Sequence, residues 1–300
     1  MTFSIVAKDE QTGQLGVAVQ THWFAVGAIC PWVEAGVGTG ATQSMVEVSY
    51  GPKSLELLRA GKTAQEALDA LLAKDKDQGL RQVAVVDALG RIAVHTGDRC
   101  IQAAGHTSGK GYSVQANMMK NDSVWPAMKN AFLVAKGDLA SRMLAALYAA
   151  QAAGGDIRGK QSAAMLVAGG EKSDEPWRHV FVNLRVDDHP EPLKELERLL
   201  NTNKAFELMN EGDALLAKNL SDAAKEKYSL AAAMAPEIEE MPFWQAVTLA
   251  DTGKIEEALP IFKEVFHKNK DWAELVKRLP ASGLLKDDAE MIRKILAVLE

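Results

Sequence analysis

The first ten residues, MTFSIVAKDE, place a threonine hydroxyl directly behind the initiator methionine. Met1 is usually removed when a small residue follows it, and we expect a chain that begins at Thr2 with no leader before it. A hydroxyl beside its own free α-amine is one form of activated nucleophile. The alternation of Phe3, Ile5 and Ala7 with their neighbours also predicts a β-strand with one buried face. Taken alone, the ten residues favour an ordinary strand and leave the nucleophile as the alternative.

A second group of reactive side chains lies in the segment AGGDIRGKQS, residues 153–162. It gathers Asp156, Arg158 and Lys160 between a predicted helix end and a predicted strand start. The guanidinium of Arg158 could bind a substrate carboxylate through its forked geometry, and Asp156 or Lys160 could tune a nearby amine. Arg158 and Asp156 could equally pair with each other. The sequence favours neither of these two interpretations over the other.

The histidines offer a weaker, metal-based alternative. His95 and His106 lie close in sequence, and the segment VDDHPEP supplies Asp187, Asp188 and His189. A histidine at a strand end more often makes a structural hydrogen bond. An acidic segment between a strand and a helix favours turn and capping roles. We therefore expect no metal and no cofactor.

Composition limits the class of protein. The 300 residues are 47% hydrophobic and 25% charged, which is typical of a globular protein, and the net charge of −6 argues against a nucleic-acid partner. We find no apolar stretch long enough to span a membrane and no signal peptide, so we expect a cytoplasmic protein. Cys30 and Cys100 lack metal-binding spacing and predict two buried thiols.

Strand and helix patterns alternate irregularly over the first two hundred residues. Hairpins, then helices, then hairpins again predict antiparallel sheets with helices packed outside, the α+β class. Gly36, Gly38, Gly40 and Thr42 share one face of a strand, which should let a helix or another backbone approach closely. The expected elements are, in chain order, a hairpin turning at Thr12-Gly13, a strand over 33–43, a helix over 55–60, a second helix capped by Thr63 and Glu66, a hairpin over 82–97, a strand over 111–119, helices between 124 and 153, strands over 162–170 and 179–187, and a helix from 193.

The pattern changes after residues 201–203, and everything to the end of the chain is predicted to be helical. A period of 34 residues relates small, large and aromatic positions, which is typical of tetratricopeptide repeats. The matched pairs are Gly212 with Ala246, Leu215 with Leu249, Ala224 with Ala258, Tyr228 with Phe262, and Ala231 with Val265. We predict one domain over 1–202 and a helical-repeat domain over 203–300. Because two repeats are few for a solenoid, the second should lean on the first domain or on a partner.

Several motifs occur in the order found in a known family. MTFSIVAKD, GVAVQTHWFAVGAICPWVEAGVGTGATQ, SYGPKSLELL, QAAGGDIRGKQSA and LRVDDHPEP resemble those of the domain-of-unknown-function 1028 family over roughly residues 2–200. The resemblance implies the N-terminal-nucleophile hydrolase-like fold, a four-layer αββα sandwich. In such hydrolases the first residue of the mature chain attacks an amide and its own amine is the general base. The resemblance therefore makes Thr2 the candidate nucleophile.

The leading hypothesis is an amide hydrolase that acts on a small-molecule amide through an acyl-enzyme. We expect Ser4 to orient the amine, Thr42 and Gln43 to contact the oxyanion or the substrate, and Arg158 to bind a substrate carboxylate. Asp156 and Lys160 are expected beside it as further substrate-binding residues. The helical repeats should bind a protein partner or mediate self-association, for example as a homodimer.

Two other hypotheses remain open. One is a non-catalytic binding protein in which the sandwich is a scaffold and the helical repeats carry the function. The other, a weaker one, is a metal-dependent hydrolase that uses His95, His106 and the Asp187–His189 segment.

Overall fold

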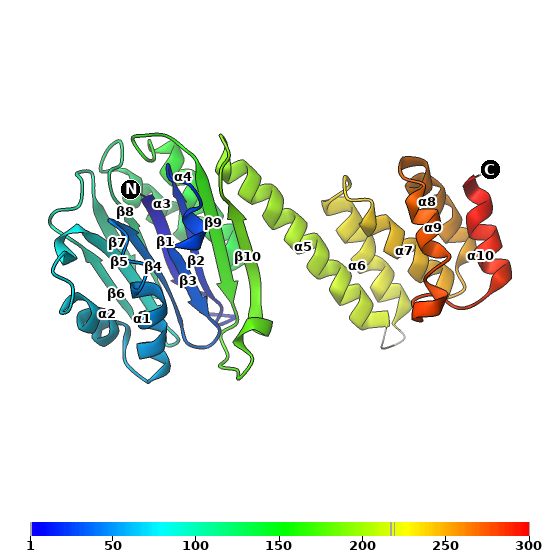
Figure 1. Ribbon diagram of the computed structural model, residues 1–300, viewed down its shortest axis with the longest axis horizontal. Helices are drawn as coiled ribbons and strands as arrows, with labels where there is room; N and C mark the ends of the chain where they lie inside the picture. The colour runs from blue at the N-terminus through cyan, green and yellow to red at the C-terminus, as the bar shows by residue number, and fades with distance from the viewer. Residues whose placement is uncertain (1, 217, 219, 300) are drawn as a thin grey trace. The chain divides into compact units, whose positions relative to one another are not determined.

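The computed structural model describes residues 2–216, 218 and 220–299 of the chain. These divide into two compact units, Met1–Leu200 and Asn201–Glu300, which we call unit 1 and unit 2. The helix α5 (Pro192–Leu216) contributes residues to both units (Figure 1). Within the described residues, no helix has both the length and the apolar composition needed to cross a membrane.

Unit 1 is built on two antiparallel sheets, as the hairpin pattern predicts. The described strands of sheet A follow the spatial order β10-β9-β2-β1-β8-β7, and those of sheet B the order β3-β4-β5-β6. Sheet A contains β1 (Thr2–Lys8), β2 (Leu15–Thr21), β7 (Gly105–Gly109), β8 (Tyr112–Ala116), β9 (Ser162–Ala168) and β10 (Val180–Val186). Sheet B contains β3 (Pro31–Glu34), β4 (Gly38–Ser44), β5 (Arg81–Asp87) and β6 (Ile92–Thr96).

Helices cover the outer face of each sheet (Figure 1). Phe3 and Ile5 of sheet A pack with α3 (Val124–Val134) and α4 (Leu139–Ala152). Sheet B packs with α1 (Tyr50–Arg59) and α2 (Ala64–Leu72), whose capping box of Thr63 and Glu66 is formed as predicted. The inner faces of the two sheets meet in an apolar cluster that includes Val6, Val17, Ala41 and Val86.

The opening strand differs from its prediction in one respect. The sequence indicates one buried face, but six of the seven residues of β1 are buried. The reason is the position of β1 in the interior of sheet A, where Phe3 and Ile5 meet the helices and Val6 meets the other sheet. Thr2 and Ser4 alternate with Phe3 and Ile5, so their side chains enter the space between the sheets.

The prediction of one strand over 33–43 is wrong, because the chain turns within it. Gly36 adopts a positive φ of 64° between β3 and β4, which pair with each other. The strand face that was expected to lack large side chains is formed only in β4. A Cβ at Gly38 would lie 2.4 Å from Cδ1 of Leu58 in α1, so the missing side chain lets that helix approach. The strand β7 is a further addition that the sequence analysis did not predict.

Unit 2 consists of helices packed in successive pairs. After α5 come α6 (Ser221–Met234), α7 (Glu240–Asp251), α8 (Ile255–Lys268), α9 (Asp271–Val276) and α10 (Ala289–Leu296). Both ends of α8 lie 34 residues after the corresponding ends of α6, so the sequence period is also a period of structure. Gly212 explains one close contact, since a Cβ there would lie 2.8 Å from the ring of Tyr228. The tetratricopeptide assignment and the domain boundary at 202/203 stay predictions.

Candidate functional site

Thr2 is fixed at the end of sheet A by its neighbours on both sides. Its backbone N–H donates to the carbonyl of Asn117 at 3.2 Å, and the N–H of Asn117 donates to the Thr2 carbonyl at 3.1 Å. On the other side, the hydroxyl of Thr2 donates to the hydroxyl of Thr21 across a 3.2 Å separation, at the last position of β2. Thr2 is 4% exposed. Two adjacent strands therefore hold both its main chain and its hydroxyl.

Two side-chain carboxamides donate hydrogen bonds to the carbonyl of Thr2. Nε2 of Gln43 donates to it at 3.2 Å, and Nδ2 of Asn117 lies 3.4 Å from it. Both amides also donate to Oε1 of Gln82, at 2.7 and 2.9 Å. Gln43 and Gln82 come from sheet B, so this set of bonds ties the two sheets together directly beneath Thr2.

Ser4 belongs to the same buried polar set. Its hydroxyl donates to Oε1 of Gln43 and accepts from Nε2 of Gln115, with oxygen–oxygen and nitrogen–oxygen distances of 2.6 Å. Ser113 donates to Gln115 in turn. We call the residues that share these bonds the amide cluster: Thr2, Ser4, Gln43, Gln82, Ser113, Gln115 and Asn117. Such a satisfied network between sheets is rigid, because each group would be costly to leave unpaired.

One atom of the amide cluster is an exception. Among the described residues, Oδ1 of Asn117 finds no hydrogen-bond partner although Asn117 is fully buried. A buried unsatisfied carbonyl costs about 1–3 kcal/mol, so the site holds an acceptor that a further N–H or O–H would stabilise.

The residues that follow two of these amides have unusual backbone angles. Ser44, after Gln43, has φ 71°, and Met118, after Asn117, has φ 56°. Non-glycine residues in the left-handed region each cost on the order of 1 kcal/mol or more and cluster at functional sites. Both strands therefore turn sharply away just beyond Thr2.

Asp156 and Arg158 are brought to this end of the sandwich and pair with each other. Nη2 and Nε of Arg158 lie 2.7 and 3.1 Å from the carboxylate oxygens of Asp156. Asp156 is 3% exposed and also accepts from the backbone N–H of His22, the residue after Thr21. The structure thus realises the pairing alternative for Asp156 and Arg158, while their role toward a substrate stays a prediction.

The other predicted contact residues lie differently. Thr42 is buried, but its hydroxyl donates to the carbonyl of Glu47 at 3.2 Å, on the face of β4 opposite to that of Gln43. The ammonium of Lys160 pairs with the carboxylate of Glu191. The structure therefore places Gln43 against the carbonyl of Thr2 and connects Ser4 to Thr2 through Gln43, whereas Thr42 and Lys160 have other partners.

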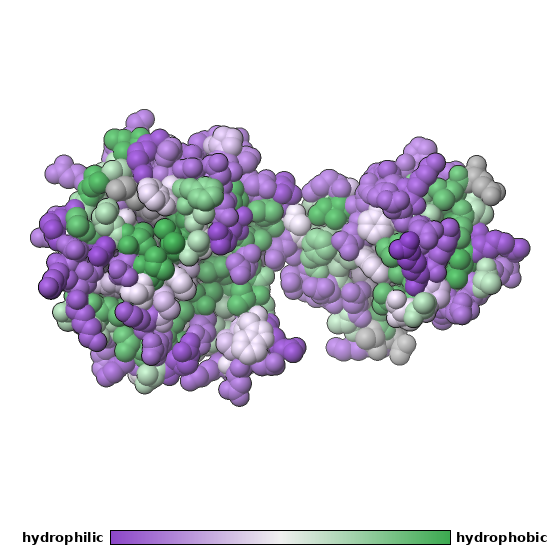
Figure 2. All heavy atoms as spheres, viewed as in Figure 1, coloured by the Kyte–Doolittle hydropathy of each residue, from purple (hydrophilic) through white to green (hydrophobic). Residues whose placement is uncertain are grey.

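Large apolar side chains are exposed on the loops at the same end of unit 1. They follow β2, β4 and β6 and precede β9, and Figure 2 shows apolar residues exposed among polar ones on the visible face of the molecule. Their exposed fractions are 59% for Trp23, 62% for Phe24, 50% for Met45, 46% for Ile101 and 61% for Ile157. We call these five residues the apolar rim. Exposed apolar residues that gather on neighbouring loops mark interaction sites more often than singly scattered ones do.

His95 and His106, the histidines of the metal-based alternative, each lie against a neutral polar group. Nε2 of His95 lies 2.8 Å from the carbonyl of Gln78, and Nδ1 of His106 lies 2.9 Å from the hydroxyl of Thr96. Burial lowers the pKa of His106, and the neighbouring His95 adds to the effect. Within the described part of the chain, no three His, Cys, Asp or Glu residues come together as metal ligands would.

Cys30 lies beside the amide cluster, with its sulfur 4.0 Å from Oε1 of Gln43. Burial raises the pKa of this thiol to about 12. Because a thiolate is the reactive form of cysteine, Cys30 is a poor nucleophile here.

Sequence reasoning missed the partners that hold Thr2. Thr21, Gln82, Gln115 and Asn117 contact Thr2 or its partners, but they lie in or directly after three strands that are distant in sequence, β2, β5 and β8. One signal was present in the sequence: carboxamide side chains stand inside the strand patterns expected over 33–43, 82–97 and 111–119, at Gln43, Gln82, Gln115 and Asn117. A buried carboxamide in a strand requires partners across the sheet.

The arrangement offers a hydroxyl, a main-chain nitrogen next to it, a free buried acceptor and an apolar surface around them. It can position a nucleophile and bind an apolar group, and its hydrogen-bonded side chains are uncharged apart from the Asp156–Arg158 pair nearby.

Comparison with known proteins places the chain in a family. Residues 2–196 match a family described as a family of unknown function, DUF1028. Among solved structures, the chain is similar to the crystal structure of protein SPO2555 from Silicibacter pomeroyi, which is assigned to the same family. The two share 33% sequence identity with a TM-score of 0.60, over 66% of this chain and 87% of that one. No curated protein matches. Since the match spans most of unit 1 and about two thirds of the chain, this protein belongs to the DUF1028 family of unknown function.

Proposed function

We propose that the protein hydrolyses an amide bond with Thr2 as an N-terminal nucleophile, once Met1 has been removed. The observation that carries this proposal is the fixation of Thr2 at the end of sheet A, with its hydroxyl against Thr21 and its carbonyl under two carboxamides. Thr2 is the first residue of its strand, and neighbouring side chains hold its carbonyl and its hydroxyl. In such an arrangement a free amine and the hydroxyl beside it can act together.

The layering of unit 1 supports the same proposal. Helices, sheet A, sheet B and helices follow one another, in agreement with the αββα sandwich that the family resemblance implies. The membership of a family without a known activity leaves the reaction open, so the proposal rests on the site.

The proposed reaction proceeds in two steps. The hydroxyl oxygen of Thr2 adds to the substrate carbonyl while its proton passes to the neutral α-amine. The amine then gives this proton to the departing nitrogen, the C–N bond breaks, and an ester to Thr2 remains. Water repeats the sequence on the ester, with its proton taken by the amine, and releases a carboxylic acid.

The amide cluster has a positioning role in this scheme. Both N–H groups of the Gln43 carboxamide are directed at Thr2, Gln82 and Gln115, so we assign Gln43 to holding Thr2 and not to binding the oxyanion. Oδ1 of Asn117, which lacks a partner, is assigned to accept a hydrogen bond from the amine or from a substrate N–H.

The apolar rim favours a substrate with an apolar group near the scissile amide. Trp23, Phe24 and Ile157 expose more than half of their surface on the loops next to Thr21 and Asp156. Covering them would contribute about 25 cal/mol for each Å² of apolar surface removed from water. The Asp156–Arg158 pair adds polar groups at the same end of unit 1.

The helical repeats of unit 2 are proposed to bind a protein partner. Their 34-residue structural period, with small residues such as Gly212 set against Tyr228, supports a tetratricopeptide-like assignment. Repeats of this kind present an extended concave surface.

The test of the catalytic proposal is covalent labelling of the full chain with an alkyl β-lactone. Ring opening by the hydroxyl of Thr2 would add the whole mass of the probe, and fragmentation would place the adduct on Thr2. Thr2→Ser should be labelled because it keeps both the amine and a hydroxyl, whereas Thr2→Ala should not.

A matched control is Thr39→Ala. Thr39 is also fully buried and its hydroxyl donates to the carbonyl of Trp32 at 3.0 Å, away from the amide cluster. This variant loses a buried hydroxyl as Thr2→Ala does, and it should be labelled like the wild type. Equal labelling of Thr2→Ala and the wild type would exclude Thr2 and favour the scaffold alternative.

A further inference from the structure

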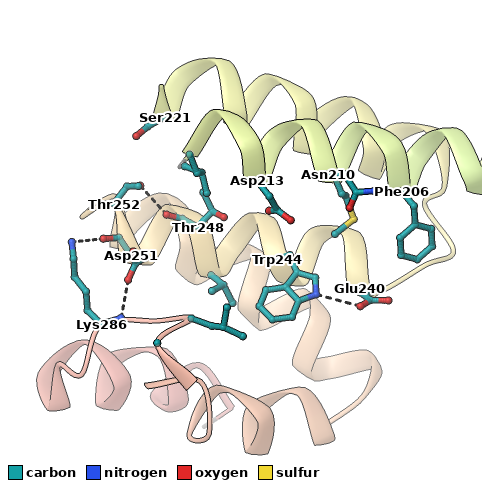
Figure 3. A pocket seen from close by; sticks show the side chains of 15 residues that line it. Phe206, Asn210, Asp213, Ser221, Glu240, Trp244, Thr248, Asp251, Thr252 and Lys286 are labelled. Carbon is teal, nitrogen blue, oxygen red and sulfur yellow. Dashed lines mark hydrogen bonds between the residues drawn. The ribbon is translucent and has the colours of Figure 1, made fainter. Parts of the chain in front are cut away.

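A groove in unit 2 forms a cavity of about 1040 Å³ between α5 and α7, with the segment 283–286 along one side. We call it the α5–α7 groove (Figure 3). Its volume lies just above the ~300–1,000 Å³ typical of small-molecule sites, which suits a segment of chain better than a compact metabolite.

The lining carries an excess of negative charge. Asp213 on α5 and Glu240 and Asp251 on α7 line the groove, and among the described lining residues Lys286 supplies the positive charge. The ammonium of Lys286 donates to the backbone carbonyl of Asp251 and not to a carboxylate. Within the described residues, none of the three carboxylates forms an ion pair.

Each carboxylate is nevertheless held in place by a neutral donor. Asp213 accepts from the hydroxyl of Tyr228, Glu240 from Nε1 of Trp244 at 3.3 Å, and Asp251 from the backbone N–H of Lys286 at 2.7 Å. Because each accepts through one oxygen in these bonds between described residues, its second oxygen is the one that we assign to a ligand.

Apolar surface lies between these charges. Figure 3 shows Asp213 on one helix and Trp244 on the other turned toward the same space. Leu284, which is 55% exposed, lines the opposite side. A guanidinium can stack on an indole ring and bind a carboxylate with two parallel N–H groups, whereas an ammonium does the second poorly.

We propose that the α5–α7 groove binds an arginine-containing segment of a partner protein in which apolar residues accompany the arginines. The arginines pair with Asp213, Glu240 and Asp251, and an apolar side chain packs against Trp244 and Leu284. The inference rests on that part of the proposed function which assigns a protein partner to unit 2, and it adds the chemistry of that partner.

The test measures binding of fluorescein-labelled peptides to the full chain by fluorescence anisotropy. One peptide alternates arginine with leucine, and its counterpart has glutamate in place of arginine. The groove variant combines Asp213→Asn, Glu240→Gln and Asp251→Asn, which keep an oxygen acceptor for each internal donor.

The matched control combines Glu226→Gln, Glu237→Gln and Asp271→Asn. It removes the same charge from exposed positions of unit 2 that do not line the groove. Circular dichroism checks that both variants are folded, and Glu240→Gln alone replaces the groove variant if that one is not.

The arginine peptide should bind the wild type and the control alike and the groove variant at least about tenfold more weakly. The glutamate peptide should not bind. An equal loss in both variants, tighter binding of the glutamate peptide, no binding of the arginine peptide to the wild type, or displacement by spermine at equal concentration would each overturn the proposal. β-Lactone labelling of Thr2 on the same variants is expected to be unchanged, so a failure at the groove is separable from a failure of the catalytic proposal.

Discussion

The hydroxyl oxygens of Thr2 and Thr21 lie 3.2 Å apart at the ends of paired strands. Thr21 is therefore the side chain that orients the proposed nucleophile. Replacing it by valine keeps the shape and removes the hydroxyl. Since one such bond is worth roughly 0.5–1.5 kcal/mol, Thr21→Val should slow β-lactone labelling of Thr2 by about two- to tenfold.

Thr39→Val is the control for this substitution. It removes a buried hydroxyl that bonds to the Trp32 carbonyl in sheet B. The labelling rate of this variant should equal that of the wild type. Identical slowing by both valine variants would mean that the effect is general loosening of unit 1 and not orientation of Thr2.

The proposed base sets the pH dependence of labelling. A free α-amine has a pKa of about 7.7–8.0 and must be neutral to accept the Thr2 proton. The labelling rate should therefore fall by about tenfold for each pH unit below that value and level off above it. Rates measured between about pH 5 and 9 decide the matter, and a flat profile would argue against the amine.

The buried thiol of Cys30 should make the free energy of unfolding depend on pH in alkaline solution. Burial raises the pKa of its thiol from 9.0 to about 12, so above pH 9 the unfolded chain releases a proton that the folded chain keeps. The free energy of unfolding should consequently fall as pH rises from about 9 toward 12, and the contribution is fully present below pH 9.

Cys30→Ala isolates this contribution. Urea unfolding at about pH 8 and about pH 10.5 should show a smaller loss of stability for the variant than for the wild type. The variant is expected to be less stable at both values, because it removes a buried sulfur from the cluster between the sheets. Parallel losses in the two proteins would contradict a shifted thiol.

The glycines of β4 allow a graded test of how closely α1 approaches sheet B. An added Cβ would lie 2.4 Å from Cδ1 of Leu58 at Gly38, but 3.2 Å from its nearest neighbour, the Ala84 carbonyl, at Gly40. Gly38→Ala should cost about 1–3 kcal/mol of unfolding free energy and Gly40→Ala less than about 1 kcal/mol. Urea titration measures both, and the reverse order would be inconsistent with the described packing.

Local patterns predicted most of the elements of unit 1. The Thr63–Glu66 capping box and the hairpins at 12–13 and 82–97 follow from rules that act within a few residues, and the structure contains them. The turn at Gly36 was missed because Gly36, Gly38 and Gly40 continue the two-residue period of a strand through it. The second buried face of β1 depends on the packing of sheet B against it, and no local pattern carries that information.

The candidate site was predictable only in part. Strand alternation and the family resemblance predicted Thr2 and Ser4. Thr42 and Gln43 were expected together, but neighbouring residues of a strand point to opposite faces, and only Gln43 lies on the inner face of β4 with Thr2 and Ser4. Gln82 joins the amide cluster from sheet B, and Gln115 and Asn117 join it from β8 and its end in sheet A, all through contacts that are distant in sequence. Such long-range contacts are fixed by topology and not by neighbouring residues.

The account's central claim is that the α-amine of Thr2 activates its hydroxyl. The most direct measurement compares β-lactone labelling of Thr2 in two forms of the full chain, one that begins at Thr2 and one that retains Met1, in which the nitrogen of Thr2 is an amide and cannot accept a proton. The form that begins at Thr2 should react at least about a hundredfold faster, the size of a general-base contribution. Equal rates of labelling in the two forms would contradict the claim.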